Sequence, residues 1–252
     1  MYLSASGVLT SMSRQDVYSN NLSNLATTGF KPQIAAIRER DVVRVEDDLP
    51  FMESNALLEK LGGGVLMQKT RWDLTPGALE QTGQTFDFGI NGHGYFVIDS
   101  GSGEGAERMR LSRDGRFTLD PRGRLVRVTD SLPVMNDDGE PIVLDRTAPI
   151  SVMANGSIRQ GENEVARIRL MDVTDPGALT MEGFGLFRAA AGTLTEATGQ
   201  IEQGQLERSA VDPVRTLMEI TKSGSAVEQN ARMIQLHYET VGRAISTLGR
   251  VA

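Results

Sequence analysis

The stretch Ser19-Asn-Asn-Leu-Ser-Asn-Leu-Ala-Thr-Thr-Gly-Phe-Lys-Pro32 decides where the first helix of this chain ends. Its three asparagines have short polar side chains that hydrogen-bond to neighbouring backbone and favour helix caps and turns. Gly29 can adopt a positive φ where the chain reverses, and Pro32 prevents the helix from resuming because it lacks a backbone N–H. We therefore expect a helix that ends within this stretch, followed by a reversal of the chain.

The residues before and within this stretch carry a weak helical pattern. Apolar residues recur on one face at helical spacing, but polar residues interrupt the stripe. The apolar positions are Val8, Met12, Leu22 and Ala26, and the interrupting residues are Gln15 and Ser19. A helix with so broken a stripe buries little on its own, so we expect it to pair with another helix.

The C-terminal part of the chain carries a much stronger helical pattern. Asp212-Pro213 predicts the helix start, with Asp as the N-cap and Pro at the first helical position. A helix from there to Leu248 would be roughly 50 Å long. Steps of three and four residues alternate along it, which is typical of a coiled-coil seam. The seam residues are Leu217, Ile220, Gly224, Val227, Ala231, Ile234, Tyr238, Val241, Ile245 and Leu248. An ordinary amphipathic helix on a domain is the alternative interpretation.

The middle of the chain, residues 84–200, reads as β-structure. Tyr95-Phe-Val-Ile98 is typical of a buried strand, and other short apolar runs follow it at regular intervals. Turn signatures separate these runs. They are Asp114-Gly115, Asp120-Pro-Arg-Gly123, Asn136-Asp-Asp-Gly139 and Asn155-Gly156. The sequence therefore predicts an α+β fold, in which N- and C-terminal helices pair as a coiled coil beside a central all-β domain, sandwich- or barrel-like.

The expected domain boundaries follow from these patterns. We expect a short helix near Glu53–Leu61 within the connecting segment. The four expected parts are an N-terminal helix and motif turn (1–37), a loop or extended connecting segment (38–83), the β domain (84–200), and an extended neck with the C-terminal helix (201–252).

A six-residue pattern, which we call the echo, occurs once on each side of the β domain. Gly77-Ala-Leu-Glu-Gln-Thr82 and Gly204-Gln-Leu-Glu-Arg-Ser209 share the pattern Gly-x-Leu-Glu-x-[Thr/Ser]. The first copy enters the β domain and the second leaves it. We expect the two to be neighbouring extended segments that form a neck between helices and β domain.

Composition excludes several classes of function. The chain has 252 residues, a net charge of -7 and no cysteine. An acidic chain of this kind is not expected to bind nucleic acid, and thiol chemistry or cysteine-ligated metals are impossible. Residues 1–12 lack the basic and apolar regions of a Sec signal peptide. No apolar run is long enough for a membrane span, so we expect no membrane insertion.

The search for catalytic chemistry finds no candidate residues. The two histidines, His93 and His237, lie far apart in sequence without an acidic ligand motif beside either. Asn136-Asp-Asp-Gly139 resembles part of a calcium loop but lacks the glutamate expected near its end. The acidic pairs Asp47-Asp48 and Asp137-Asp138 fit solvated loops. We therefore predict no enzyme activity, no cofactor, and no catalytic or metal site.

Three motifs follow one another along nearly the whole chain. The first consists of Asn20, Asn21, Leu22, Asn24, Thr28, Gly29, Phe30 and Lys31. The second consists of Gly92, Gly94, Tyr95, Phe96 and Ile98. The third is Gln203-Gly-Gln-Leu-Glu-Arg-Ser209 with Val211-Asp212. In this order they resemble the signatures of the bacterial flagellar basal-body rod and hook proteins. The chain's ends look most like those of the proximal-rod protein, with the distal-rod protein as the alternative.

The resemblance implies a structural subunit that assembles helically with itself and with other rod proteins, and transmits torque for motility. It implies export by the flagellar type III apparatus without a cleaved signal, and a place in the axial rod in the periplasm. The terminal helices would form the inner coiled-coil layer and the β domain the outer one.

Within this picture the first motif is an assembly motif. Phe30 would fill an apolar gap between helices, and Gly29→Val would impair assembly more than folding of the β domain. Two other functions stay open on the residues alone. An adhesin or carbohydrate-binding module would need an exposed aromatic platform, and a lytic enzyme would need a cleft with two convergent carboxylates.

Overall fold

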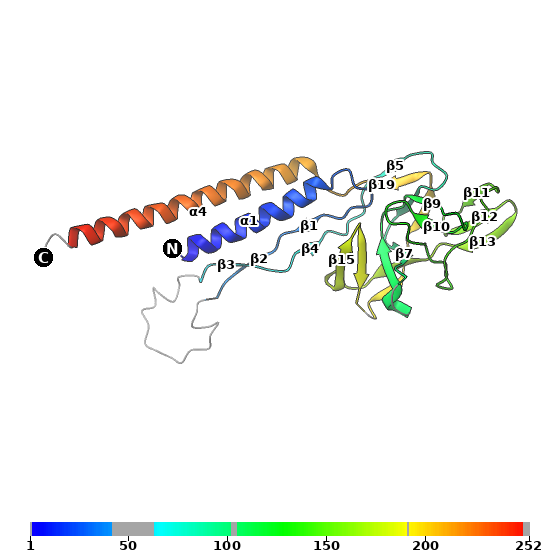
Figure 1. Cartoon of the computed structure of the whole chain (residues 1–252), viewed down its shortest axis with the longest axis horizontal. Helices are drawn as coiled ribbons and strands as arrows, with labels where there is room; N and C mark the ends of the chain where they lie inside the picture. Colours follow the sequence, from blue (N-terminus) through cyan, green and yellow to red (C-terminus); the bar gives the residue numbers. More distant parts are fainter. Residues whose placement is uncertain (1, 42–62, 102–104, 191, 249–252) are drawn as a thin grey trace. The chain divides into compact units, whose positions relative to one another are not determined.

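The computed structural model describes residues 2–41, 63–101, 105–190 and 192–248 (Figure 1). The expected helix at 53–61 lies outside these ranges. The chain divides into two compact units, each built from segments far apart in sequence. We call the first the helical unit, which comprises Met1–Ser23, Gln33–Arg71 and Asp212–Ala252. We call the second the β unit, which comprises Asn24–Pro32 and Trp72–Val211.

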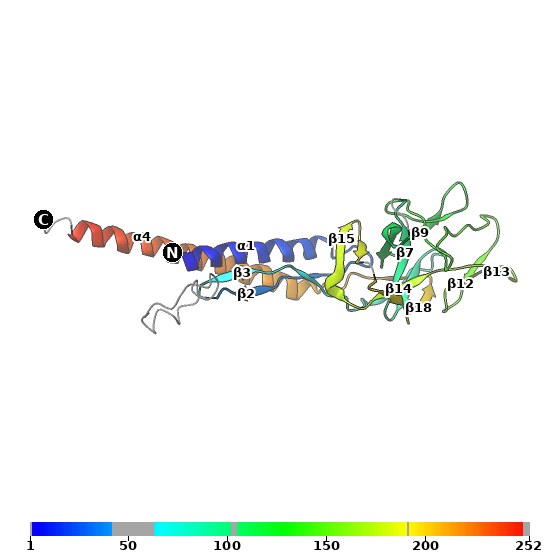
Figure 2. The same cartoon turned by 90° about the horizontal axis from the view of Figure 1, so that it is seen from below.

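The helical unit is dominated by α1 (Tyr2–Ser23) and α4 (Pro213–Leu248), which contact each other. The two helices run antiparallel, and α4 extends past the N-terminal end of α1 (Figures 1 and 2). The expected contact between N- and C-terminal helices is thus confirmed. A short antiparallel pair, β2 (Ile37–Glu39) and β3 (Val65–Met67), belongs to the same unit, as does β1 (Gln33–Ile34). The strand β4 (Arg71–Trp72) lies at the boundary between the units in sequence.

The start of α4 has the chemistry that its sequence predicts. The carboxylate Oδ1 of Asp212 accepts hydrogen bonds from the backbone N–H groups of Val214 and Arg215, at 2.9 and 3.1 Å. These are two of the donors that have no partner within a helix. Pro213, which lacks an N–H, occupies the first helical position without loss. Neither helix has the length and apolarity that would let it cross a membrane, among the residues described.

The β unit is built on a six-stranded antiparallel sheet with strand order β15-β16-β8-β7-β14-β17. Its central strand β7 is buried along its whole length. Because successive side chains point to opposite faces of a strand, Phe96 and Ile98 join one apolar cluster while Tyr95 and Val97 join another. The bounds are β7 (Tyr95–Asp99), β8 (Met109–Ser112), β14 (Leu170–Val173), β15 (Leu179–Gly183), β16 (Leu186–Ala189) and β17 (Leu194–Glu196).

Smaller sheets complete the β unit, so the central region is a multi-sheet structure. The internal echo proves to be a strand pair, since β5 and β19 pair antiparallel with Leu206 opposite Glu80. This confirms that the two copies are extended neighbours. The sheets are β5 (Leu79–Gln81) with β19 (Gln205–Glu207), β6 (Phe88–Asn91) with β18 (Gln200–Gln203), β9 (Phe117–Leu119) with β10 (Leu125–Arg127), and β11 (Ile150–Val152) with β12 (Ser157–Gln160) and β13 (Asn163–Arg167). Two short 3₁₀ helices are η1 (Gly105–Arg108) and η2 (Pro176–Ala178).

The prediction of a hairpin turn is wrong at one of the four expected positions. Asp114-Gly115 does not close a hairpin, because β8 before it pairs with β7 and β16, whereas β9 after it pairs with β10. Gly115 is needed for another reason: a Cβ there would clash with the backbone carbonyl of Phe88. The other three expected turns are chain reversals, in which the N–H groups of Gly123, Gly139 and Gly156 donate to the carbonyls three residues earlier.

Candidate assembly interface

The first half of the sequence motif lies on α1 and fixes the end of that helix within the helical unit. Asn21 is 3% exposed. Its side-chain amide donates to the carbonyl of Gln33 at 2.8 Å and accepts from the N–H of Gln33 at 2.9 Å. The amide therefore pairs with Gln33 as a strand would, and holds the returning chain beside the helix. Asn20 is exposed and Leu22 half-buried.

The second half of the motif belongs to the β unit. The carbonyl of Asn24 accepts from the N–H of Thr27, and its side-chain Oδ1 accepts from the Thr27 hydroxyl, both at 3.2 Å. These bonds form the turn that the asparagine predicted. Thr28 is half-buried.

Gly29 has φ +66° and donates its N–H to the carbonyl of Glu207 at 2.8 Å. A Cβ at Gly29 would clash with the carbonyl of Arg113, in the same unit. The expectation for Gly29→Val therefore changes, because a side chain here would strain the β unit itself. Phe30 is 4% exposed and is grouped with the β unit, and its packing against helices stays a prediction.

Lys31 enters a buried cluster of three charged side chains in the β unit. Its ammonium donates to Glu207 Oε1 at 2.6 Å and to the carbonyl of Thr75 at 2.7 Å. Arg113 donates to Glu207 Oε2 at 2.9 Å and to the carbonyl of Gly92 at 2.9 Å. The side chains of Lys31, Glu207 and Arg113 are each at most 1% exposed. The carboxylate of Glu207 thus links Lys31 of the motif to β19, the strand that precedes the exit from the β unit.

Burial sets the electrostatics of this cluster. Desolvation lowers the pKa of Lys31 below its usual value, although the neighbouring carboxylate of Glu207 acts in the opposite direction. Burial also raises the pKa of Tyr95, whose ring lies 5.1 Å from the Arg113 guanidinium, to about 12. Sequence reasoning placed Glu207 in two motifs but did not predict its burial, and it did not identify Arg113. The only sequence signal for this cluster was the glutamate shared by the two echo copies. The structure buries Glu207 of the second copy and exposes Glu80 of the first.

The contact between α1 and α4 is made by small and polar side chains. Gly7 of α1 faces Asn230, since a Cβ on Gly7 would lie 2.8 Å from Asn230 Oδ1. Further along, Arg14 forms an ion pair with Glu219 at 3.1 Å. Ser223 and Thr216, seven and fourteen positions before Asn230, are also polar and occupy the same face of α4. The most buried side chains of the two helices, apart from Asn21, are Thr10, Ser11, Thr216 and Ser223, at 7%, 8%, 7% and 2% exposure.

The apolar residues of the helices lie mostly outside this contact. Of the expected seam, Ile220, Gly224, Val227 and Ile234 are half-buried, and Leu217, Ala231, Tyr238, Val241 and Ile245 are exposed. Leu248 ends α4, but its side chain is outside the described part. Other exposed apolar side chains on the helices are Leu3, Leu9, Met12, Val214, Met218, Met233 and Leu236. The helices therefore present an apolar surface while burying hydroxyl and amide groups.

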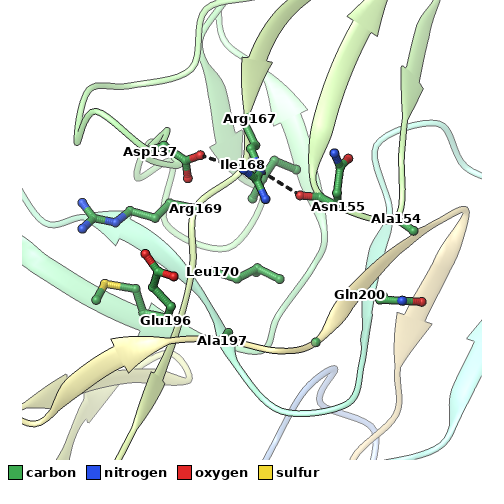
Figure 3. Close-up of a pocket in the computed structure, with 12 residues that line it drawn as sticks. Asp137, Ala154, Asn155, Arg167, Ile168, Arg169, Leu170, Glu196, Ala197 and Gln200 are labelled. Carbon is green, nitrogen blue, oxygen red and sulfur yellow. Dashed lines mark hydrogen bonds and ion pairs between the residues drawn. The ribbon is translucent and has the colours of Figure 1, made fainter.

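A pocket of about 600 Å³ in the β unit is lined by charged, polar and apolar side chains (Figure 3). Asp137 forms an ion pair with Arg167 at 3.6 Å, and Arg167 also donates to the carbonyl of Asn155 at 2.9 Å. The other carboxylate in the lining is Glu196. Within the described ranges, no group of three His, Cys, Asp or Glu side chains is placed to hold a metal ion.

The single tryptophan does not form an exposed binding platform. Trp72 packs edge-on against Phe187, with ring centroids 5.2 Å apart, beside the second apolar cluster of the β unit. The adhesin alternative needed an exposed aromatic platform on the β domain, and the tryptophan does not supply one.

Comparison with known proteins gives a consistent result along the chain. Residues 1–31 match a family model described as "Flagella basal body rod protein". The chain is 31% identical over 259 residues to the flagellar basal-body rod protein FlgF of Caulobacter vibrioides, covering 100% of this chain and 98% of that protein. It is 27% identical to FlgF of Escherichia coli, covering 97% and 96%. It is 28% identical to the flagellar basal-body rod protein FlgG of Bacillus subtilis, covering 93% of each chain.

Proposed function

Because the chain belongs to the flagellar basal-body rod protein family, we propose that it serves as a structural subunit of the proximal rod. The family is structural, not enzymatic, and its members build the rod of the flagellar basal body. The subunit assembles with other rod proteins and, in this proposal, also with further copies of itself. The assembled rod transmits torque for motility.

The observation that carries this proposal is that the helical unit buries polar side chains and leaves many apolar side chains exposed. Its contact between helices buries Thr10, Ser11, Thr216 and Ser223. Its exposed side chains include Leu9 at 66%, Val214 at 66% and Ile245 at 66%. An apolar surface of this kind on a long helix is stabilised when other helices cover it. Packing among subunits supplies those helices.

The seam residues then act between subunits. In this proposal Leu217, Ile220, Val227, Ala231, Ile234, Tyr238, Val241, Ile245 and Leu248 contact helices of neighbouring subunits. The motif residues Asn20, Asn21, Leu22, Asn24, Thr28, Gly29, Phe30 and Lys31 act indirectly, by fixing the end of α1 and the fold of the chain beyond it. The hydrogen bonds of Asn21 and the ion pair of Lys31 support this indirect role.

The proposed route to the rod follows from the family. The chain leaves the cytoplasm through the flagellar type III export apparatus, without a cleaved signal peptide, and reaches the axial rod in the periplasm. Mass spectrometry of the protein from purified basal bodies tests this directly. An intact N-terminus is the expected result, and a shortened N-terminus contradicts uncleaved export.

The function is tested by deleting the gene and imaging purified basal bodies by electron microscopy, with mass spectrometry of their contents. The expected result is a rod that stops short of its full length and is restored by the intact gene. A rod that keeps its whole proximal portion and lacks only its distal portion would instead assign the chain to the distal rod. Complete rods in the deletion strain, together with absence of the protein from wild-type basal bodies, would contradict a structural role.

A further inference from the structure

The β15–β16 hairpin of the β unit carries an aromatic residue where its turn disfavours one. Phe184 and Gly185 are the two turn residues, with φ +49° and +69°. Two consecutive positive φ values are typical of a type I′ turn, which favours Asn, Asp or Gly at both central positions. A bulky residue with φ > 0 is strained. The turn would therefore be easier to form without the phenylalanine, which points to a role outside folding.

The strained turn is held by a fully buried arginine. Arg127 is 0% exposed and donates to the backbone carbonyl of Phe184 at 3.0 Å. The same guanidinium donates to Ser112 Oγ at 2.6 Å and forms an ion pair with Asp130 at 2.5 Å. Ser131, which also has a positive φ at 59°, donates its N–H to the Arg127 carbonyl. The hairpin tip is thus anchored to the core of the β unit.

The side chain of Phe184 is open to solvent. It is 73% exposed, the highest value among the exposed large apolar side chains of the described residues. A rigid, exposed aromatic loses little conformational entropy on binding and can bury a large apolar area. These are the properties of an anchor residue at a protein interface.

The helical unit carries an open, shallow apolar depression on one face of α4, which we call the α4 pocket. It has a volume of about 430 Å³ and is lined by Val214, Leu217, Met218, Thr221 and Lys222. These residues follow the spacing i, i+3, i+4, i+7 and i+8, so they form one face of α4. Thr216 and Ser223, which are buried, lie on the opposite face by helical geometry. The pocket is apolar, apart from the hydroxyl of Thr221 and the charged end of Lys222.

We propose that Phe184 of one subunit inserts into this α4 pocket of a neighbouring copy of the same chain. The inference rests on the proposed rod function, because it assumes that copies pack together. Met218 is a flexible side chain that adapts to an aromatic ring, and the ammonium of Lys222 can lie over the ring face. The contact joins two different surfaces, so it is head-to-tail, the type that extends a helical assembly without closing it.

The first test separates an interface role from a folding role. Phe184→Asn places a residue favoured in type I′ turns at this position, so the thermal midpoint of the isolated protein should stay the same or rise. Incorporation into basal bodies should fall several-fold, with a loss of swimming. Val165→Asn, at an exposed residue on β13, is the matched control and should assemble normally. Normal incorporation of Phe184→Asn, or a lowered midpoint that accounts for its loss, would overturn the proposal.

The second test identifies the partner and uses the absence of cysteine in the chain. Cells would co-express Phe184→Cys and Met218→Cys as separate subunits, and purified basal bodies would be oxidised and run on a non-reducing gel. A dimer band that requires both variants supports the proposal. A band from Phe184→Cys alone, or no band although both variants are present in the rod, overturns it. Absence of the wild-type protein from basal bodies would contradict the proposed function itself, so the two failures are distinguishable.

Discussion

The two compact units of this chain differ in how much of their apolar side-chain surface they bury. The β unit buries Phe96 and Ile98 at 0% exposure on a central strand that is covered on both faces. The helical unit buries Thr216 and Ser223 and exposes large apolar residues along α4. Neither unit has a disulfide, because the chain has no cysteine.

The contrast teaches where each unit obtains its stability. Apolar surface stabilises a fold by about 25 cal/mol for each Å² removed from water. The β unit removes that surface within one chain, whereas the helical unit keeps much of it exposed. We infer that the β unit is stable by itself and that the helical unit gains much of its stability on assembly. Folding and assembly are therefore separable by mutation, and the predictions below test this separation.

The largest effect should come from a cavity in the β unit. Ile98→Ala removes a fully buried side chain from the larger apolar cluster, and we expect a loss of about 4 kcal/mol in the free energy of unfolding. The matched control is Ile245→Ala, on the exposed face of α4, with a change of less than about 0.5 kcal/mol. Chemical denaturation of the isolated protein measures both. Similar losses for the two variants would show that the units do not differ as described.

Removing the buried carboxylate should have the second-largest effect. Glu207→Gln leaves Lys31 and Arg113 buried without a counter-charge, and we expect a loss of about 3 kcal/mol. The echo supplies the control, because Glu80 occupies the same position in the shared pattern but forms only an exposed pair with Arg208 at 3.6 Å. Glu80→Gln should change stability by less than about 0.5 kcal/mol. A Glu207→Gln protein as stable as the wild type would show that the ionic cluster does not stabilise the β unit.

The sequence predicted those features that depend on local chemistry. Asp212-Pro213 marks the start of α4 because an N-cap and a first-turn proline act within a few residues. The buried run Tyr95–Ile98 and the pairing of the two echo copies were also predicted. In each case the residues themselves carry the signal.

Features that depend on distant contacts were not predictable from one chain. Nothing near Gly115 reveals that the backbone of Phe88 approaches it. Nothing in the 3–4 pattern of α4 reveals that the polar residue Ser223 shares its side of the helix with Ile220 and Val227, which are half-buried. Glu207 is buried and Glu80 is exposed, although both occupy the same position in one sequence pattern. Tertiary contacts therefore determine whether such a side chain is buried.

Alkaline pH should reveal the buried tyrosine at the centre of the β unit. Burial raises the pKa of Tyr95 from 10.0 to about 12, so the folded state disfavours the ionised form. This contribution to stability is fully present below the unfolded pKa and is lost as pH rises towards the folded value. By about pH 11.5 the loss is about 2 kcal/mol. Tyr95→Phe cannot ionise, and its stability should fall less than that of the wild type over this pH range.

The comparison of the two proteins isolates the tyrosine, because their lysines and arginines titrate alike. Unfolding by denaturant should be measured at several pH values between 9 and about 12, with the difference between the two proteins as the readout. A difference that stays constant over this range would contradict a raised pKa of Tyr95 in the folded state.

The smallest effect on stability should accompany a complete loss of assembly. Leu236 is 55% exposed on α4, so Leu236→Asp in the isolated subunit should change the free energy of unfolding by less than about 0.5 kcal/mol. In the rod, that side chain is proposed to be covered by a neighbouring helix, where an unpaired carboxylate is costly. We therefore expect an exported, folded subunit that does not enter basal bodies, scored by motility and by electron microscopy. Leu236→Met keeps the apolar character and should assemble normally. If Leu236→Asp subunits enter the rod normally, this part of α4 faces solvent in the assembly, and the exposed apolar residues of the helical unit need another explanation.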